Sequence, residues 1–558
     1  MSEDSGSKPL PYAGRWVAHV RGQVIAQGGT PEQARRAAQG SRFKETPEIV
    51  YMPTALPLTF SPLLDSVRAA LPDDLTVYLV GGAVRDALQG RITHDLDFAL
   101  SRDGIRTARR VANALKADFY SLDPERDTGR VIITAEDGRR TVMDFTAFRG
   151  PNLETDLQGR DFSLNAMAMD VRTLSIYDPL GGALDLKEKR LRACSASTFG
   201  DDPVRILRGV RLAAAFGFHI PPETRQAMKD AVSLLPQVSA ERLRDELFRI
   251  LEGPQPATCI RALDVLGALA PILPELPTLK DVVQPAPHLN DVWTHTLGTL
   301  NHLESTLAAL SPDYNPDTAT DLFNGLLVLR IGRYRQQLAR HLAAAINVNR
   351  SLIGLLFLAA LYHDVAKPLS KTTDKEGRLR FWGHDEEGAQ MAVERARALQ
   401  LSNDEVERLR TIVRHHMRVH YQTDRLVKER KQPTRRAIYR FFRDAGVAGV
   451  DIVLLALADF RATYEHTLPQ DVWTACLDVC RSFLENWWEK PEESVVPPSL
   501  VNGKEVMEAL GLQPGPQVGE LLKAIREAQA MGEVVTREQA MAFAREWMEK
   551  NKYSRGTK

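Results

Sequence analysis

Apolar and polar residues follow two different periods along the 558 residues of this chain. Between about residues 58 and 190, short apolar runs such as VYLV alternate with segments of helical spacing, which predicts a mixed sheet with helices. From about residue 191 onward the spacing is helical, for example in RILRGVRLAAAFGF and SAERLRDELFRIL. The predicted fold class is therefore multidomain, an α/β region followed by all-α regions.

A chain of this length exceeds what a single core can organise, so we expect several domains. Residues 1–57 predict a small β-hairpin–helix appendage, with two strands joined at Arg21-Gly22, a capped helix in TPEQARRAAQGS and a proline-containing linker at Met52–Pro62. The change of spacing then predicts an α/β head at 58–190, a helical neck at 191–275, a helical, histidine-rich domain at 276–465 and a helical tail at 466–558.

The composition indicates the cellular compartment in which we expect the protein. Hydrophobic residues make up 44% of the chain, and no apolar run approaches the ~20 residues that span a membrane. The start, MSEDSGSKPLPYAG, lacks the apolar stretch of a secretory signal. The four cysteines form no CxxC pair, which fits a reducing compartment. We therefore expect a cytoplasmic protein with no membrane partner, and the oligomeric state stays open.

Charge gives only a local signal, because 72 basic and 72 acidic residues cancel. The segment Arg408–Arg443 holds twelve Arg and Lys residues but only two acids, with histidines and aromatic residues between them. Such a segment can contact RNA phosphates and stack on unpaired bases. It can equally be a solvated helix face that covers core aromatic residues, so both interpretations stay open.

The most informative stretch is Tyr78–Leu100, YLVGGAVRDALQGRITHDLDFAL. A predicted strand leads into Gly81 and Gly82, whose backbone N–H groups can approach phosphate at the start of a helix. In the strand that follows, Asp95 and Asp97 alternate with apolar residues, so both carboxylates are predicted on one face. Two such carboxylates can share divalent metals in an in-line displacement. The alternative is a solvated acidic edge strand.

GGAVRD followed by DLD resembles the signature of the nucleotidyltransferase superfamily, in the form found in class II tRNA nucleotidyltransferases and bacterial poly(A) polymerases. The resemblance implies a nucleotidyltransferase head that transfers NMP from CTP and ATP to the 3′ end of tRNA. It implies Mg²⁺ held by Asp95 and Asp97, and nucleotide contacts from Gly81, Gly82, Arg85 and Asp86.

Two further motifs support this resemblance. TVMDFTAFRG supplies a third carboxylate, Asp144, which is implied to join the metal pair, and an arginine, Arg149, which is implied to contact the triphosphate. DLQGRDFSLNAMAMD resembles the second family motif, which implies ribose and phosphate contacts. The matching positions are Arg160, Asp161 and Asn165. An arginine of that motif is replaced here by Gly159, so one phosphate contact is in doubt.

FGDDPVRILRG resembles the family motif that reads the incoming base, with Asp202, Arg205 and Arg208 as nucleotide-binding residues. Asp202 and Arg205 lie three apart, so we predict that they share a helix face. A carboxylate can accept from the amino group of cytosine or adenine while a guanidinium donates to the ring nitrogen. Uracil and guanine would leave both groups mispaired, which costs binding. A surface ion pair is the alternative.

The helical region contains a second metal constellation. It is spread over five short segments: WTHTL with His295, LYHDVAKP with His363-Asp364, GHDEEGA with His384, RHHMR with His415-His416, and LALADF with Asp459. Imidazole and carboxylate groups together suit a transition metal. The order resembles HD phosphohydrolases, which implies a helical HD domain with His295, His363, Asp364 and Asp459 as ligands of an Mn²⁺- or Ni²⁺-type ion. Core histidines with satisfied hydrogen bonds are the alternative.

The product is less certain than the reaction. Only six residues, GPNLET, separate Arg149 from Asp156, and in the family shorter flexible elements in this region accompany enzymes that add part of CCA. CCA addition is the first expectation, with a CC-only or A-only enzyme or a poly(A) polymerase as alternatives. A different class, an HD hydrolase with an inert head, is disfavoured by the intact GGAVRD and DLD.

Overall fold

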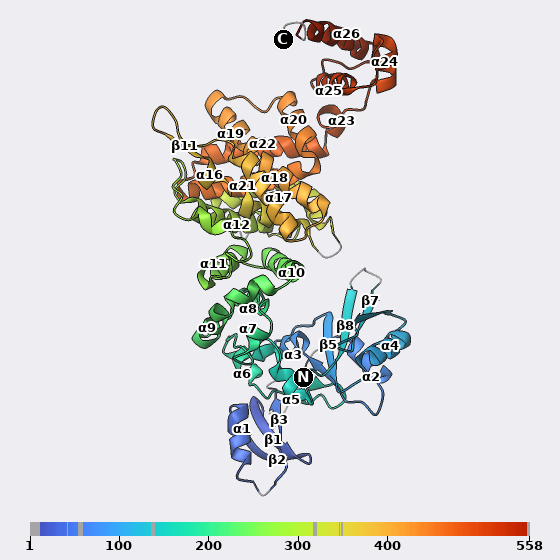
Figure 1. The fold of residues 1–558 in the computed structure, drawn as a ribbon, viewed down its shortest axis with the longest axis vertical. Coiled ribbons are helices and arrows are strands. Elements are labelled where there is room, and N and C mark those ends of the chain that lie inside the picture. Colours follow the sequence, from blue (N-terminus) through green and yellow to red (C-terminus); the bar gives the residue numbers. More distant parts are fainter. Residues whose placement is uncertain are drawn as a thin grey trace, which may run out of the picture. The chain divides into compact units, whose positions relative to one another are not determined.

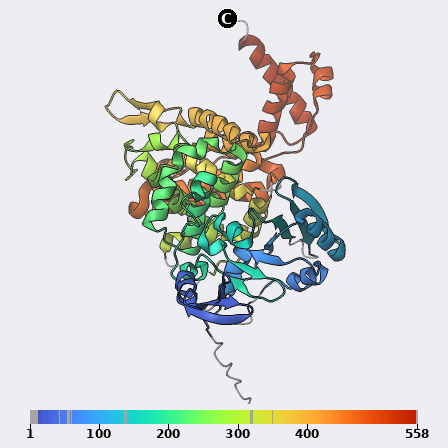
Figure 2. The same ribbon diagram turned by 60° about the horizontal axis from the view of Figure 1, so that its bottom comes forward.

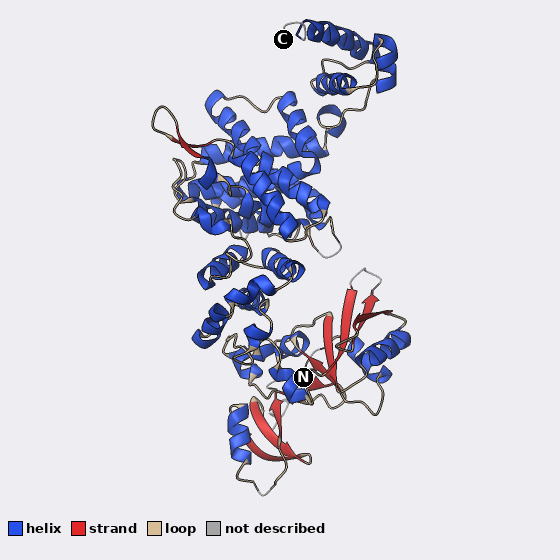
Figure 3. Ribbon diagram, viewed as in Figure 1, coloured by secondary structure: helices blue, strands red, loops and turns tan. Residues whose placement is uncertain are grey.

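The structure is a computed structural model that describes residues 12–41, 43–53, 58, 60–135, 140–315, 321–344, 346–347 and 350–554. Parts of the predicted linker at Met52–Pro62 lie outside the described residues. The chain divides into two compact units, Met1–Val238 and Ser239–Lys558, which are described separately below. Figure 3 shows that strands characterise the first unit and helices the second.

The first unit is organised by one ten-stranded sheet with the order β2-β1-β3-β10-β9-β4-β5-β8-β7-β6 (Figure 1). Its strands are β1 (Arg15–Val20), β2 (Gln23–Gly28), β3 (Glu48–Met52), β4 (Val77–Val80), β5 (Asp95–Leu100), β6 (Asp118–Asp123), β7 (Thr128–Thr134), β8 (Arg140–Ala147), β9 (Ala168–Asp170) and β10 (Ile176–Tyr177). Only β5 and β8 pair in parallel, so the sheet is mixed, as predicted.

Helices complete this unit. They are α1 (Pro31–Ala38), α2 (Leu63–Ala70), α3 (Gly82–Leu88), α4 (Gly104–Leu115), α5 (Leu153–Gln158), α6 (Gly182–Lys187), α7 (Thr198–Asp201), α8 (Arg205–Phe216) and α9 (Pro222–Asp230). The apolar positions of β5 point into the core, where the rings of Phe98 and Phe145 stack 4.6 Å apart. The alternation predicted for β5 is therefore confirmed.

The N-terminal segment extends the sheet of the head. The predicted hairpin at Arg21-Gly22 and the helix α1, capped by Thr30, are confirmed. In Figure 2 the dark-blue helix lies against the dark-blue strands. β3 pairs with β10, and the buried Trp16 Nε1 donates to the backbone oxygen and Oδ2 of Asp178, both at 3.1 Å. Backbone pairing and a buried hydrogen bond thus attach this segment to the head.

The second unit is built from helices around an apolar core. They are α10 (Ala240–Leu251), α11 (Pro256–Leu266), α12 (Val292–Ala309), α13 (Leu322–Ile331), α14 (Arg335–Ala343), α15 (Leu352–Tyr362), α16 (Lys367–Ser370), α17 (His384–Ala398), α18 (Asn403–His415), α19 (Met417–Glu429), α20 (Arg435–Ala445), α21 (Gly449–Tyr464), α22 (Gln470–Trp488) and α23 (Pro491–Ser494). A short ribbon, β11 (Lys371–Thr373) with β12 (Leu379–Phe381), precedes α17.

One stretch, Leu352–Ser370, is long and apolar enough to match a membrane-spanning helix, with a mean hydropathy of 1.4. Its unbroken apolar run ends at Tyr362, because His363 and Asp364 follow. The apolar window is 83% buried inside the unit, which is the pattern of a core helix. Length and composition are therefore weak evidence for a membrane span here.

The last helices have a core of their own. α24 (Gly503–Leu510), α25 (Pro516–Ala530) and α26 (Arg537–Ser554) pack around a cluster that includes Val506, Leu521 and Ile525. α24 begins with a capping box in which the Asn502 side chain accepts from the Glu505 N–H and the Glu505 carboxylate accepts from the Asn502 N–H. A helical tail is therefore confirmed.

Candidate functional site

Strand pairing brings the three predicted carboxylates of the head together. β4 runs antiparallel to β5 with Val80 opposite Asp97, and β5 runs parallel to β8 with Asp97 opposite Asp144. Asp95 lies two residues before Asp97 and therefore on the same face of the sheet. All three groups meet beside the turn that joins β4 to α3.

The turn itself requires glycine. Gly81 has φ of +73° and ψ of −138°, a conformation that side chains other than glycine rarely adopt. A β-carbon at this position would lie 3.3 Å from Asp97 Oδ2 and 3.5 Å from Arg160 Nη1. The bare backbone of Gly81 therefore lets the turn approach both the acidic and the basic group.

The carboxylates of Asp95, Asp97 and Asp144 lie close enough together to repel one another. The pKa of Asp97 is raised, chiefly because neighbouring protein atoms displace water from its carboxylate, and further because Asp144 and Asp95 repel it. Arg160 counteracts this shift. The residue as a whole keeps solvent access. A carboxylate that is crowded by other carboxylates yet open to solvent is suited to a divalent cation.

Asp144 has a partner that the sequence analysis did not name. Arg130 on β7 lies opposite Asp144 in the antiparallel register, and its Nε and Nη2 donate to Oδ1 and Oδ2 at 2.8 Å each. This bidentate pair fixes the plane of the Asp144 carboxylate. The signal in the sequence was the alternation of TGRVIIT, which places Arg130 on a strand, but only the register shows which acid it meets.

Two predicted arginines, Arg149 after the Asp144 strand and Arg160 of the second motif, share the carboxylate of Asp156. Arg160 donates to Asp156 Oδ2 from Nε at 3.2 Å and Nη2 at 3.1 Å. The Arg149 N–H donates to Asp156 Oδ1 at 3.1 Å. Burial and repulsion by Arg160 lower the pKa of Arg149. Asp156 thus accepts from the guanidinium of Arg160 and from the backbone of Arg149, and an anion nearby would reduce the repulsion between the two guanidinium groups.

Four other predicted residues form a network in which Arg85, Asp161 and Asn165 are buried and Arg208 is exposed. Arg85 Nη1 donates to Asn165 Oδ1 at 2.8 Å, and Asn165 Nδ2 donates to Asp161 Oδ1 at 3.1 Å. Asp161 Oδ2 lies 2.8 Å from Arg208 Nε. Burial opposes ionisation of Asp161, but Arg208 and the hydrogen bonds lower its pKa.

The Arg85 side chain of this network is surrounded by protein groups. Its Nε donates to Asp86 Oδ1 at 2.8 Å, and its guanidinium lies 4.4 Å from the centre of the Phe216 ring. The side chain is buried, and its recorded hydrogen bonds are to protein groups. Arg85 therefore braces the turn in this structure, and a direct contact with nucleotide stays a prediction.

The prediction that Asp202 and Arg205 share a helix face is wrong. Asp202 follows α7 and has an extended backbone, with φ of −154° and ψ of 95°, whereas α8 begins at Arg205. The reason is Pro203, because a residue before proline is driven out of the helical region. The two side chains still form an ion pair at 4.0 Å. Arg205 also donates to the backbone oxygens of Gly159 and Thr198.

The basic segment Arg408–Arg443 combines both interpretations left open above. Tyr439, Phe441 and Phe442 are buried in the core, whereas Tyr421 is 61% exposed. A surface groove of about 670 Å³ runs over the segment and is lined by Arg418, Tyr421, Arg436, Arg440 and Arg443 among other residues. Acidic neighbours in α20 and α25 pair with several of these arginines. The aromatic residues are thus mostly structural, and the arginines form the surface.

The second unit brings the predicted HD residues to one buried point. His295 lies on α12, His363 and Asp364 follow α15, and Asp459 lies on α21. His295 Nε2 is 3.0 Å from Asp459 Oδ1 and 3.3 Å from His363 Nε2. His363 Nε2 is 3.1 Å from Asp364 Oδ2. These four side chains are at most 5% exposed.

Two further histidines complete the cluster. His384 begins α17 and His416 lies between α18 and α19, with their Nε2 atoms 3.3 Å apart. They lie 3.4 Å and 3.8 Å from Asp364 Oδ1. The neighbouring His415, which the sequence could not distinguish from His416, belongs to neither group of candidate metal ligands among the described residues.

Burial and charge shape this cluster strongly. The pKa of Asp364 is held well below its usual range: burial opposes ionisation, but His363 and Lys367 favour it. Burial also opposes the charged form of His363, yet Asp364 and Asp459 raise its pKa to about 9. His416 has a pKa well below its usual range, because it is buried beside His384 and His363.

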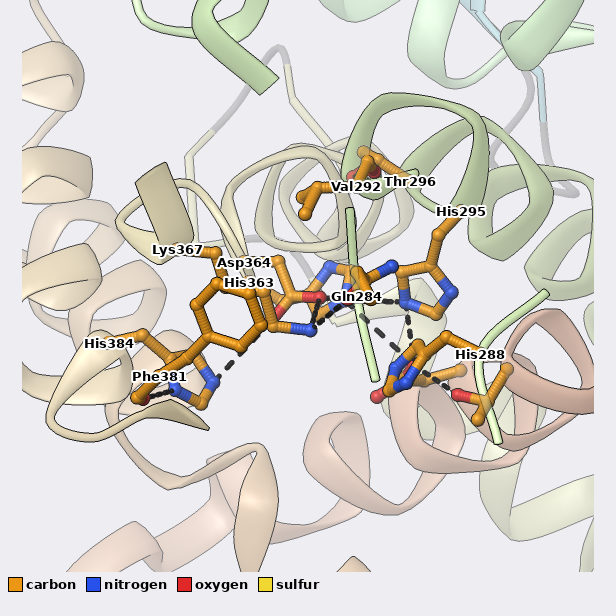
Figure 4. Close-up of polar contacts among 12 residues, drawn as sticks. Gln284, His288, Val292, His295, Thr296, His363, Asp364, Lys367, Phe381 and His384 are labelled. Carbon is orange, nitrogen blue, oxygen red and sulfur yellow. Dashed lines mark hydrogen bonds and ion pairs between the residues drawn. The ribbon is translucent and has the colours of Figure 1, made fainter. Parts of the chain in front are cut away.

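A loop and a lysine border the cluster. Figure 4 shows Asp364 between His363 and His384, with Lys367, Gln284 and His288 around them. Lys367 Nζ lies 2.6 Å from Asp364 Oδ2 and donates to Gln284 Oε1 at 2.6 Å. The rings of His288 and His295 meet edge to face, 5.1 Å apart. The sequence analysis named none of Lys367, Gln284 and His288.

Comparison with known proteins matches four segments of this chain to known domains. Family models match the poly(A) polymerase head domain at residues 77–192, the probable RNA- and SrmB-binding site of polymerase A at 217–279, the HD domain at 333–444 and tRNA nucleotidyltransferase domain 2 at 499–544. The CC-adding tRNA nucleotidyltransferase of Thermus thermophilus is 35% identical over 474 residues, covering 84% of this chain and 93% of that protein. The chain belongs to the tRNA nucleotidyltransferase family.

Other members of the tRNA nucleotidyltransferase family are also similar. The A-adding enzyme of Deinococcus radiodurans is 34% identical, covering 84% of this chain and 95% of that protein. A solved CCA-adding enzyme in complex with CTP shares the fold, with a TM-score of 0.55 and 19% identity over 88% of this chain and 96% of that one. The predicted nucleotidyltransferase head and HD domain are thereby confirmed. His295 and Asp459 lie outside the matched HD residues.

The donor groups fit divalent metals at both sites. The head offers carboxylate oxygens from Asp95, Asp97 and Asp144, which are ligands that Mg²⁺ prefers. The HD site offers imidazole nitrogens with carboxylates, which suit first-row transition metals. The free cysteines contribute to neither group, and three of the four are buried.

Proposed function

We propose that this chain transfers nucleotides from CTP and ATP to the 3′ end of tRNA in the cytoplasm. The observation that carries this proposal is the register of β4, β5 and β8, which gathers Asp95, Asp97 and Asp144 beside the Gly81 turn. Membership of the tRNA nucleotidyltransferase family supports the substrate class.

In the proposed reaction the terminal tRNA hydroxyl attacks the α-phosphorus of the nucleotide. A new P–O bond forms, the bond to the leaving pyrophosphate breaks, and the hydroxyl proton is released. Asp95 and Asp97 would hold Mg²⁺, whose positive charge would stabilise the attacking and leaving oxygens. Asp144, oriented by Arg130, completes the acidic cluster.

The surrounding residues position the triphosphate. Arg160, whose guanidinium is held by Asp156, and Arg149, whose backbone N–H donates to the same carboxylate, can neutralise its charge, and the glycine turn leaves room for it. The network of Arg85, Asn165 and Asp161 fixes the turn from beneath. Asp202 and Arg205 are proposed to read the edge of the base.

The direct test uses three tRNA substrates that end before CCA, after the first C and after CC. Each is incubated with one labelled nucleotide, CTP, ATP, UTP or GTP, and with Mg²⁺. We expect incorporation from CTP or ATP only, with products of fixed length. Unlimited A addition would point to a poly(A) polymerase, and no incorporation on any substrate would refute the proposal.

Complete CCA addition is the first candidate product, and partial addition is the second. A specific observation favours the second. The chain passes from β8 to α5 through only Phe148–Asn152, and Asn152 caps the helix by accepting from the Thr155 N–H at 2.9 Å. Relatives that add CC or A alone are similar over 84% of this chain. The tRNA ending in CC and the tRNA ending before CCA together distinguish the products, because a CC-only enzyme leaves the first unchanged and an A-only enzyme leaves the second unchanged.

We also propose that the HD domain hydrolyses phosphate esters with an Mn²⁺- or Ni²⁺-type metal. Support comes from the buried convergence of His295, His363, Asp364 and Asp459. Lys367, whose ammonium group contacts Asp364, can donate a hydrogen bond to a phosphate oxygen. Hydrolysis of a chromogenic phosphodiester across a metal series tests this activity, and no hydrolysis with any metal would refute it.

A further inference from the structure

The Phe216 ring contacts arginines of α3 and of the loop after it, although it belongs to the helix that carries the proposed base-reading residue Arg205. Phe216 is the last residue of α8 and Arg205 is the first. The Arg85 guanidinium lies 4.4 Å from the centre of the Phe216 ring, and that of Arg91 lies 5.8 Å from it. We propose that Phe216 is a positioning residue for nucleotide addition, whose ring holds Arg85 and the glycine turn at a fixed place relative to α8.

Arg85 connects the Phe216 ring to the glycine turn. A β-carbon on Gly82 would lie only 3.3 Å from Arg85 Nη2, so the guanidinium lies directly against the backbone of the turn. Arg85 Nη1 donates to Asn165 Oδ1 and Nε donates to Asp86 Oδ1, both at 2.8 Å. These hydrogen bonds use the edge of the planar guanidinium and leave its face available for an aromatic ring. A shift of the ring would therefore be passed on to the turn.

The helix α8 is attached to the same network at a second point. Arg208 Nε lies 2.8 Å from Asp161 Oδ2, and Asp161 Oδ1 accepts from Asn165. Arg205, Arg208 and Phe216 follow one another at spacings of three and eight residues, so they share one side of α8. Phe216 lies about 16 Å along the helix from Arg205. A contact at this far end limits the tilt of α8, which the contact of Arg208 alone does not.

The chemistry of the contact distinguishes a positioning role from simple packing. A cation over an aromatic ring is attracted by the electrons of the ring face, and the attraction is stronger when the cation has lost its water. Arg85 is buried, and the Phe216 ring is half-buried. A leucine would occupy much of the same space without this attraction, whereas a tyrosine would keep the ring. The inference rests on the proposed nucleotide addition.

The experiment compares Phe216→Leu with Phe216→Tyr in the full chain. Addition of labelled CMP and AMP is measured on the tRNA substrates that the wild type extends. We expect kcat/KM for the nucleotide to fall about tenfold in Phe216→Leu and to change by no more than about twofold in Phe216→Tyr. The KM for tRNA should not change in either variant. Wild-type kinetics in Phe216→Leu, or an equal loss in Phe216→Tyr, would overturn the proposal.

Phe119→Leu is the matched control, because the Phe119 ring contacts the Arg109 guanidinium at 4.9 Å and belongs to neither α3 nor α8. It should add nucleotide as the wild type does, and a loss equal to that of Phe216→Leu would overturn the proposal. A double-mutant cycle tests the route through Arg85. In an Arg85→Met background, Phe216→Leu should cost no more than about twofold. A further tenfold loss there would also overturn the proposal.

Thermal unfolding identifies a Phe216→Leu protein that does not fold, and Phe216→Met then takes its place. Equilibrium binding of CTP to the same variants needs no turnover, and it should weaken in Phe216→Leu but not in Phe216→Tyr. If the wild type adds no nucleotide, the proposed function fails and CTP binding alone decides. Equal CTP binding by the wild type and Phe216→Leu would then overturn the role of Phe216.

Discussion

In the first unit, three carboxylates meet because β4, β5 and β8 pair in a particular register, and Asp95 stays exposed to solvent. In the second unit, four histidines and two aspartates meet from several helices, and all of them are buried. The first arrangement leaves one side free for a large substrate that brings its own phosphates. The second encloses its candidate ligands among helices, away from solvent.

The difference teaches how each site balances charge. In the head, loss of water around the Asp97 carboxylate, and then repulsion by Asp144 and Asp95, raise the pKa of Asp97, and nearby arginines counter that shift. In the HD cluster, Lys367 and the histidines lie against Asp364 and lower its pKa. We therefore expect the head to bind metal weakly until nucleotide is present, and the HD cluster to retain metal on its own.

The largest expected effect is that of Asp97→Asn on nucleotide addition. The change removes a charged oxygen ligand while keeping the side-chain shape, so addition should fall by about 10²–10³-fold or more, as loss of several kcal/mol of charge stabilisation requires. Incorporation of labelled CMP into tRNA measures this. Manganese bound at the HD cluster should not change. Near-normal incorporation would remove Asp97 from the proposed metal site.

Asp364→Ala provides the reciprocal test. It removes the carboxylate that faces both histidine groups, so ester hydrolysis and HD metal content should be lost together. Nucleotide addition should stay within about twofold, because its acids lie in the other compact unit. Both reactions are assayed on the same purified variant. Loss of nucleotide addition in a folded protein would show that the two sites are coupled.

Arg130→Met tests the residue that orients Asp144. Loss of a partner that orients a metal ligand typically costs about 10–100-fold. We expect the Mg²⁺ concentration for half-maximal addition to rise, a readout that a general packing defect would not move. Arg102→Met is the matched control: this arginine of the head is exposed and pairs with Asp74. Equal Mg²⁺ requirements in both variants would leave Arg130 without a positioning role.

Asp202→Ala should have the smallest effect on rate and a selective effect on specificity. A lost base contact costs ~1–3 kcal/mol, so preference for CTP over UTP should fall about tenfold or more. Asp201→Ala serves as control, because Asp201 accepts from Ser197. Ratios of kcat/KM for the nucleotides measure the effect. Unchanged exclusion of UTP and GTP would show that Asp202 does not read the base.

These sites were predictable from sequence to different degrees. The glycine turn and the DLD strand are contiguous motifs, so their local geometry follows from a short window. The Arg130–Asp144 pair depends on strand register, and the β3–β10 pairing joins distant segments, so neither follows from periodicity. Asp202 was misplaced because helical spacing was given more weight than the proline that follows it.

For the HD cluster, the residue types and their order in the sequence indicated that a site exists, but not which residues belong to it. His415 and His416 are adjacent, and only the end of α18 decides which ring turns inward. Lys367 meets Asp364 only three residues away in the sequence, whereas Gln284 reaches Lys367 through a tertiary contact that no local pattern encodes. The predicted set of four was therefore incomplete, because burial and convergence are properties of the packed helices.

Three of the HD histidines take their orientation from their own short stretch of chain. His363, His384 and His416 each place Nδ1 against the carbonyl oxygen three residues earlier, in Ala360, Phe381 and Val413. The orientation of each imidazole ring is therefore fixed within its own short stretch of chain, and no distant side chain is needed to maintain it. During evolution, the segments that connect these stretches could lengthen or shorten while each histidine ring kept its orientation. Because each ring is oriented locally, one metal ion should be exchangeable for another without a change in the fold of the domain.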